Sequence, residues 1–130
     1  MAQSRKNRSE TGTLEVVDKV ISGGFLGVFS PDAAAETIAA GDGGAISVTS
    51  ALTYVSTDGD DDAFTLADGS VIGQMKSIVV VTDGGGDAVV TPSNYADGST
   101  ITFADAADFC VLIWNGTNWR TVVNVGGTIA

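Results

Sequence analysis

Few residues of this sequence could take part in catalysis, and none of its 130 residues is a histidine. Histidine is the usual proton carrier near neutral pH and the commonest metal ligand, so nucleophiles that depend on it are excluded. The single cysteine, Cys110, lies in the apolar run 109–114, where burial makes a thiol less acidic and less accessible. We therefore expect Cys110 to be a core residue, and it has no partner for an internal disulfide.

Aspartates crowd the segment 58–62, where alternating carboxylates suggest the start of a calcium-binding loop. The spacing does not fit, because Ala63 stands where such a loop has its sharp-turn glycine and Gly69 where it has the closing glutamate. The sequence leaves open whether this cluster binds a cation weakly through Asp58, Asp60, Asp61 and Asp62. The more economical interpretation is a solvated turn, so the expected metal and cofactor content is none.

Paired carboxylates for glycoside hydrolysis are equally hard to find. Asp105 and Asp108 flank an apolar run, but no base or positioning group accompanies them. The glycine-rich segment 83–87 lacks the lysine and the following helix that phosphate-binding loops need, and we expect a hairpin turn there. We therefore expect no catalytic residues and no enzymatic activity.

Two tryptophans offer a different kind of chemistry. Trp114 and Trp119 flank the tetrapeptide 115–118, Asn-Gly-Thr-Asn, which is a strong hairpin signal and would bring the two rings close together. Such a pair could form a platform for a sugar. Aromatic residues beside a hairpin more commonly fix strand register or lie at an interface, and we favour that interpretation.

Charge is distributed unevenly along the chain. The net charge of −10 would repel a phosphate backbone, so nucleic acid is not an expected partner of the body. Three of the six cations, Arg5, Lys6 and Arg8, fall within the first eight residues. A basic arm is attracted over long range to an acidic neighbouring surface, and we expect these three residues to contact a partner.

From residue 45 onward, short β-branched and aromatic runs alternate with turn residues, as in sandwiches and jelly rolls. Predicted strands cover 45–49, 51–56, 63–67, 74–82, 87–91, 99–104, 109–114 and 119–125. Alternation with a period of two predicts four core pairs: Ile46 with Val48, Leu52 with Tyr54, Phe64 with Leu66, and Ile101 with Phe103.

Two apolar runs, 78–81 and 109–114, break this alternation. A strand that is apolar on both faces must be covered on both sides, either inside a sandwich that has an outer partner or at an oligomer interface. The candidate subunit-interface residues are Ile78, Val80, Val111, Ile113, Trp114 and Trp119.

The N-terminal third divides into two parts. Residues 1–12 form a basic polar arm, and residues 13–44 form a connector that packs on the body, the β-sandwich domain 45–130. The candidate partner-binding residues of the connector are Phe25, Leu26, Val28 and Phe29. A helix of one or two turns is expected after Ser30 and Pro31. The sequence shows no secretion signal and no run long enough to cross a membrane, so we expect synthesis in a cytoplasm and no membrane partner.

Several short segments resemble a module of tailed-phage virion proteins, particularly those of marine phages and cyanophages. They are 64–69 (Phe-Thr-Leu-Ala-Asp-Gly), 73–76 (Gly-Gln-Met-Lys), 84–88 (Gly-Gly-Gly-Asp-Ala), 91–92 (Thr-Pro), 98–103 (Gly-Ser-Thr-Ile-Thr-Phe) and 114–119 (Trp-Asn-Gly-Thr-Asn-Trp). The resemblance covers residues 63–123. It implies an all-β module that commonly assembles as a trimer, in capsid decoration (cement) proteins or in fibres, and it brings no catalytic residues.

Together these observations predict an all-β protein, a β-sandwich of jelly-roll type with an extended N-terminal arm. The expected function is that of a capsid decoration protein that binds the major capsid protein on the outer surface of the virion as a homotrimer. The alternative is a fibre, knob or tail component that binds a host-surface glycan. An accessory domain of a carbohydrate-active enzyme is a third interpretation, weakened by the missing secretion signal.

Overall fold

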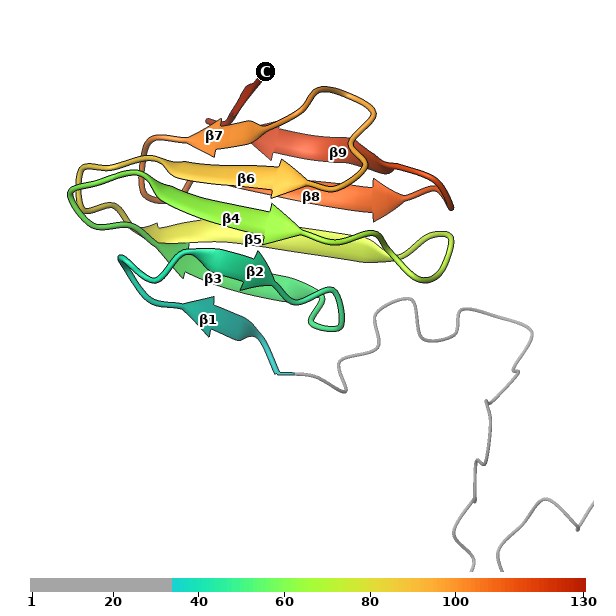
Figure 1. Cartoon of the computed structure of the whole chain (residues 1–130), viewed down its shortest axis with the longest axis horizontal. Helices are drawn as coiled ribbons and strands as arrows, with labels where there is room; N and C mark the ends of the chain where they lie inside the picture. Colours follow the sequence, from blue (N-terminus) through green and yellow to red (C-terminus); the bar gives the residue numbers. More distant parts are fainter. Residues whose placement is uncertain (1–33) are drawn as a thin grey trace, which may run out of the picture.

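The computed structural model describes residues 34–130, which form a β-sandwich of two five-stranded sheets (Figure 1). Sheet A has the strand order β1-β3-β5-β8-β9, and sheet B has the order β10-β7-β6-β4-β2. The strands are β1 (Glu36–Ile38), β2 (Gly44–Ile46), β3 (Leu52–Ser56), β4 (Asp62–Leu66), β5 (Met75–Thr82), β6 (Ala88–Pro92), β7 (Ile101–Phe103), β8 (Phe109–Trp114), β9 (Trp119–Val125) and β10 (Thr128–Ile129). The predicted all-β sandwich is confirmed.

The eight predicted strands all occur, and most of their ends fall within two residues of the predicted ones. Two further strands, β1 and β10, were not expected. They contain three and two residues, which is too short for an alternating pattern to be recognised. The helix expected after Ser30 is wrong over residues 36–38, where the chain pairs with β3 as an edge strand.

The first six strands alternate between the two sheets, so that the chain winds as a flattened coil (Figure 1). Within each sheet successive turns of the coil pair in parallel: β1 with β3 and β3 with β5 in sheet A, and β2 with β4 and β4 with β6 in sheet B. These connections differ from those of a jelly roll, whose strands run antiparallel. Both β1 and the start of β2 belong to the sandwich, so residues 36–44, which were predicted to lie in the connector, are part of the body.

The length of one coil turn explains why the sequence shows no repeat. Glu36 pairs with Thr53, 17 residues further on, whereas Thr53 pairs with Ile78 after 25 residues. The additional residues lie in the loop between β4 and β5 and in the longer strand β5. The segment 83–87 likewise crosses from sheet A to sheet B, so the hairpin expected there is wrong.

The last four strands close the other side of the sandwich with antiparallel pairs. The hairpin predicted between Trp114 and Trp119 is confirmed, since these two residues pair across the β8–β9 ladder. Residues 94–97 then run along the outer edge of β9. The Trp119 amide donates to the carbonyl of Asn94, and the Thr121 amide donates to the carboxylate of Asp97 at 2.6 Å. The edge of sheet A at β9 is therefore partly covered by the chain itself.

The core lies between the sheets and is built from one face of each strand. Its buried apolar residues are Ile46, Val55, Phe64, Leu66, Ile78, Val80, Ala88, Val90, Ile101, Phe103, Cys110, Leu112, Trp114 and Trp119. Of the four predicted pairs, Phe64 with Leu66 and Ile101 with Phe103 are confirmed. In a third pair Ile46 is buried, and Val48 is partly buried against the core. Burial raises the pKa of the Cys110 thiol to about 12, as befits a core residue.

The strand β3 turns the opposite face inward from the one predicted. Thr53 and Val55 are buried, while Leu52 and Tyr54 lie on the outer side of sheet A. The alternation of β3 predicted that its apolar residues face the core and its polar residues face solvent, and Thr53 reverses this arrangement. Thr53 can be buried because a buried polar group satisfies its hydroxyl, as described below.

Candidate interaction surface

The outer face of sheet A is unusually apolar for a surface that meets water. Because Thr53, Ile78, Cys110 and Leu112 point into the core, the residues that alternate with them point outward. We call this surface the apolar face, and it comprises Leu52, Tyr54, Met75, Val79, Phe109, Val111, Ile113, Val123 and Val125. Val123 and Val125 are 40% and 47% exposed, and the other seven side chains are partly buried.

Strand register arranges these side chains in rows that cross the sheet. One row runs through Tyr54, Val79, Phe109 and Val125, and the next through Leu52, Ser77, Val111 and Val123. Residues directly opposite one another on neighbouring strands have Cβ atoms about 5 Å apart. Each row is therefore continuous across four strands, and the apolar face is a single patch rather than scattered residues.

Charge is nearly absent from this face. A third row pairs Met75 with Ile113 and Ile113 with Arg120, which is the one charged residue in the three rows. Arg120 lies toward one corner and forms an ion pair with Asp97 at 3.0 Å. Large contiguous apolar patches of this kind mark interaction sites on soluble proteins.

The six predicted interface residues divide between the two sides of sheet A. Val111 and Ile113 lie on the apolar face, as an interface requires. Ile78, Val80, Trp114 and Trp119 point inward and are at most 5% exposed, so their assignment to an interface is wrong. The runs 78–81 and 109–114 are apolar on both sides because one side fills the core and the other forms the apolar face.

The two tryptophans do not form a sugar platform. Their ring centroids lie 5.4 Å apart with an interplanar angle of 60°, so they are close together as predicted, but both are buried. The indole Nε1 of Trp119 donates to the carbonyl of Ala67 at 2.9 Å. The pair locks the β8–β9 hairpin against the loop after β4, and neither ring is available to a ligand.

Aspartates concentrate in the loops at one end of the sandwich, on the left in Figure 1. They are Asp42, Asp58, Asp60, Asp61, Asp83, Asp87, Asp105 and Asp108. Several carboxylates here accept hydrogen bonds from backbone amides, for example Asp61 from Asp87 and Asp58 from Asp60, both at 2.9 Å. Within residues 34–130, no three acidic, histidine or cysteine side chains are grouped as a metal ion requires.

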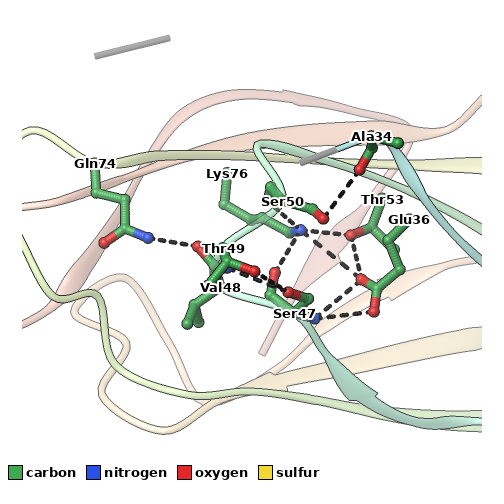
Figure 2. Close-up of polar contacts among 9 residues, drawn as sticks. All are labelled: Ala34, Glu36, Ser47, Val48, Thr49, Ser50, Thr53, Gln74 and Lys76. Atoms are coloured by element: carbon green, nitrogen blue, oxygen red, sulfur yellow. Dashed lines mark hydrogen bonds and ion pairs between the residues drawn. The ribbon is translucent and has the colours of Figure 1, made fainter. Parts of the chain in front are cut away.

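A buried lysine lies at the opposite end of the sandwich, where β5 begins, and Figure 2 shows its polar contacts. The sequence predicted no site there. Lys76 on β5 is completely buried. Its ammonium donates to the carbonyls of Ser47 and Ser50 at 2.7 and 2.8 Å, and to the hydroxyl of Thr53. All three ammonium hydrogens therefore have an acceptor, which is the condition for burying such a charge.

Glu36 completes this cluster from the edge strand β1. Its Oε2 lies 4.0 Å from the Lys76 Nζ and accepts a hydrogen bond from the Thr53 hydroxyl at 2.7 Å. The same carboxylate accepts from the Ser47 amide. The cluster thus ties β1, the β2–β3 loop, β3 and β5 together. Lys76 could have been found in the sequence, because it shares a predicted face with Ile78 and Val80.

The buried lysine predicts a pH dependence of stability. Burial lowers the pKa of Lys76 from 10.5 to about 8, while Glu36 opposes the shift. Between pH 8 and 10.5 the unfolded chain therefore binds more protons at this residue, and the free energy of unfolding should rise with pH, by up to about 1 kcal/mol per unit. Urea denaturation at pH 8, 8.5 and 9 measures this slope.

Cys110 provides the control for that measurement. Its raised pKa means that the unfolded thiol loses its proton first, so it lowers stability above about pH 9. A Cys110→Ala variant should therefore continue to gain stability up to pH 10, whereas the native chain should level off. If the free energy of unfolding fell between pH 8 and 9, the lowered pKa of Lys76 would be contradicted.

The predicted arm residues Arg5, Lys6 and Arg8, and the connector residues Phe25, Leu26, Val28 and Phe29, lie outside the described part of the chain. Residues 34–130 include no helix that is long and apolar enough to cross a membrane. No family model matches this sequence, and no curated protein matches it. The fold and its apolar face define the molecule as a β-sandwich with one surface suited to protein contact.

Proposed function

We propose that this protein is a non-catalytic component of a phage virion, a decoration protein that binds the outer capsid surface as a homotrimer and stabilises the shell. The observation that carries the proposal is the apolar face of sheet A, which presents nine apolar side chains on four strands. The short segments between residues 63 and 123 resemble a phage virion module, and this resemblance supports a place on the virion.

The mechanism is mechanical. Each subunit covers its apolar face against a neighbouring subunit, and the assembled trimer bridges adjacent copies of the major capsid protein. A standard interface buries about 800 Å² per partner. Three linked subunits raise the effective concentration of every capsid contact, so attachment is tight even where a single contact is weak.

Charge orients the subunit in this assembly. The aspartate-rich end would repel its own copies, so it points away from the trimer contacts and into solvent. The basic residues Arg5, Lys6 and Arg8 have the opposite sign and are attracted to an acidic surface of the shell or of a neighbouring subunit. The arm thus supplies steering and the apolar face supplies the buried contact area.

Cosedimentation with capsid shells of a phage whose genome encodes the chain tests this function. The full chain should sediment with the shells at a fixed ratio, and deletion of residues 1–12 should weaken binding, most clearly at low salt. Bovine serum albumin serves as the negative control. If the full chain stays in the supernatant while it is trimeric in solution, the capsid function is wrong although the assembly is right.

A further inference from the structure

One side of the coil ends on strands without neighbours in the described part of the chain. β1 pairs only with β3, and β2 pairs only with β4. Alternate amide and carbonyl groups of an edge strand point away from its sheet and can pair with a further strand. Because β1 and β2 lie at the same side of the sandwich, they form one continuous edge, which we call the open edge (Figure 1).

The opposite side of sheet A is treated differently. There residues 94–97 cover the beginning of β9 through backbone hydrogen bonds, in which the Ala96 amide also donates to the carbonyl of Trp119. No such segment accompanies β1 within residues 34–130. Natural sheets cover or blunt their edges because an uncovered edge leads to aggregation. β1 and β2 are only three residues long, which limits the exposed edge, but their outer pairing groups leave room for a further strand on each sheet.

Core side chains at the open edge are incompletely covered. Ile38 on β1 lies in the same row as Val55 on β3 and packs against the core. Val55 has a strand on either side and is fully buried, whereas Ile38 has one neighbour and is only partly buried. A further strand beside β1 would complete the burial of Ile38.

The chain that enters β1 has the composition and length for one more turn. Two apolar segments precede β1, residues 16–21 (Val-Val-Asp-Lys-Val-Ile) and 25–29 (Phe-Leu-Gly-Val-Phe), and a Ser-Gly-Gly turn separates them. Six residues, 30–35, then lead to Glu36. The crossings between the two sheets range from two residues, at 126–127, to eight, at 67–74, and 39–43, 47–51 and 57–61 have five each. The three residues 22–24 and the six residues 30–35 both fall within this range, so the spacing of the two apolar segments is compatible with a continuation of the coil.

We propose that residues 16–29 bind the open edge of their own chain as one further turn of the coil, with 16–21 beside β1 and 25–29 beside β2. This order continues the alternation between sheet A and sheet B that the next six strands follow. Phe25, Leu26, Val28 and Phe29 then cover the body rather than the shell.

Hydrogen exchange of the full chain, read by mass spectrometry, tests the inference. Amides in 16–21 and 25–29 should exchange at least about 100-fold more slowly than unstructured peptides of the same sequence. Amides in residues 1–12 should exchange at the unstructured rate. Unstructured rates throughout 16–29 would overturn the inference.

A matched pair of proline variants tests which surface the segment contacts. Val20→Pro removes a backbone donor within the proposed strand and should increase the exchange of β1 and β2, whereas Asn7→Pro in the arm should leave both unchanged. Unchanged exchange of β1 and β2 in Val20→Pro would contradict docking on the open edge.

A monomeric form of the protein distinguishes whether residues 16–29 bind the open edge of their own chain or that of a neighbouring subunit. A Val111→Glu, Ile113→Glu variant disrupts the apolar face, which is remote from the pairing groups of β1 and β2. If the segment comes from its own chain, protection of 16–29 persists in this variant. Loss of protection on dissociation would assign the segment to a neighbouring subunit and overturn the inference, while the trimer itself would stand.

Discussion

Replacing Lys76 with methionine is expected to lower the free energy of unfolding by about 3–5 kcal/mol. Methionine fills a similar volume but donates no hydrogen bond, so the carbonyls of Ser47 and Ser50 lose their buried donor. Glu36 also loses its cation. Each buried polar group left without a partner costs about 1–3 kcal/mol. Urea denaturation followed by tryptophan fluorescence measures the change, because Trp114 and Trp119 are in the core.

Arg120→Met is the matched control for this substitution. It also removes a cation from an ion pair, but the Arg120 side chain is 54% exposed and its pair with Asp97 is open to water. Exposed pairs contribute less than about 1 kcal/mol. If Lys76→Met changed stability by as little as Arg120→Met, the buried cluster would not hold β1 and the β2–β3 loop in place.

Placing glutamates on the apolar face is expected to abolish assembly. In the Val111→Glu, Ile113→Glu variant, two acids stand on neighbouring rows of a surface that otherwise carries no acidic side chain. The acid at position 111 lies between Ser77 and Val123 and has no cation opposite it. Burying such an unpaired charge costs several kcal/mol, so the affinity between subunits should fall at least about 100-fold. Sedimentation velocity over a range of concentrations measures the dissociation.

The opposite sheet supplies the matched control for the glutamate variant. Thr65 and Thr91 pair with each other on the outer face of sheet B, and both are exposed. Thr65→Glu with Thr91→Glu adds the same charge to the other side of the sandwich and should leave assembly intact. Equal dissociation of both variants would mean that added negative charge, rather than the apolar face, controls assembly.

Local patterns in the sequence were sufficient for most strands but not for their connections. Turn residues bounded the runs that became β3 to β9, and the Asn-Gly pair at 115–116 predicted the β8–β9 hairpin. Whether successive strands pair as hairpins or cross to the other sheet depends on contacts between distant residues. The aspartate-glycine turn at 58–59 looks the same in either case, and here it leads from sheet A to sheet B.

The interaction surface could be predicted only in part, because apolar side chains serve both the core and an interface. The run 109–114 indicated a strand that is apolar on both sides, but its composition could not show which residues face inward. Lys76 was overlooked for a related reason. A lysine on the inward face of a strand contradicts the apolar pattern of a core, and its burial can be predicted only when its hydrogen-bond acceptors are known. These acceptors belong to Ser47, Ser50 and Thr53, more than 20 residues away in the sequence.

The native mass of the full chain, measured by light scattering after gel filtration, tests most directly whether the apolar face is a subunit interface. The account predicts a particle of about three times the 13.1 kDa chain mass, falling toward a single chain in the Val111→Glu, Ile113→Glu variant. A native protein that stays at 13.1 kDa at every concentration would contradict assembly through this face.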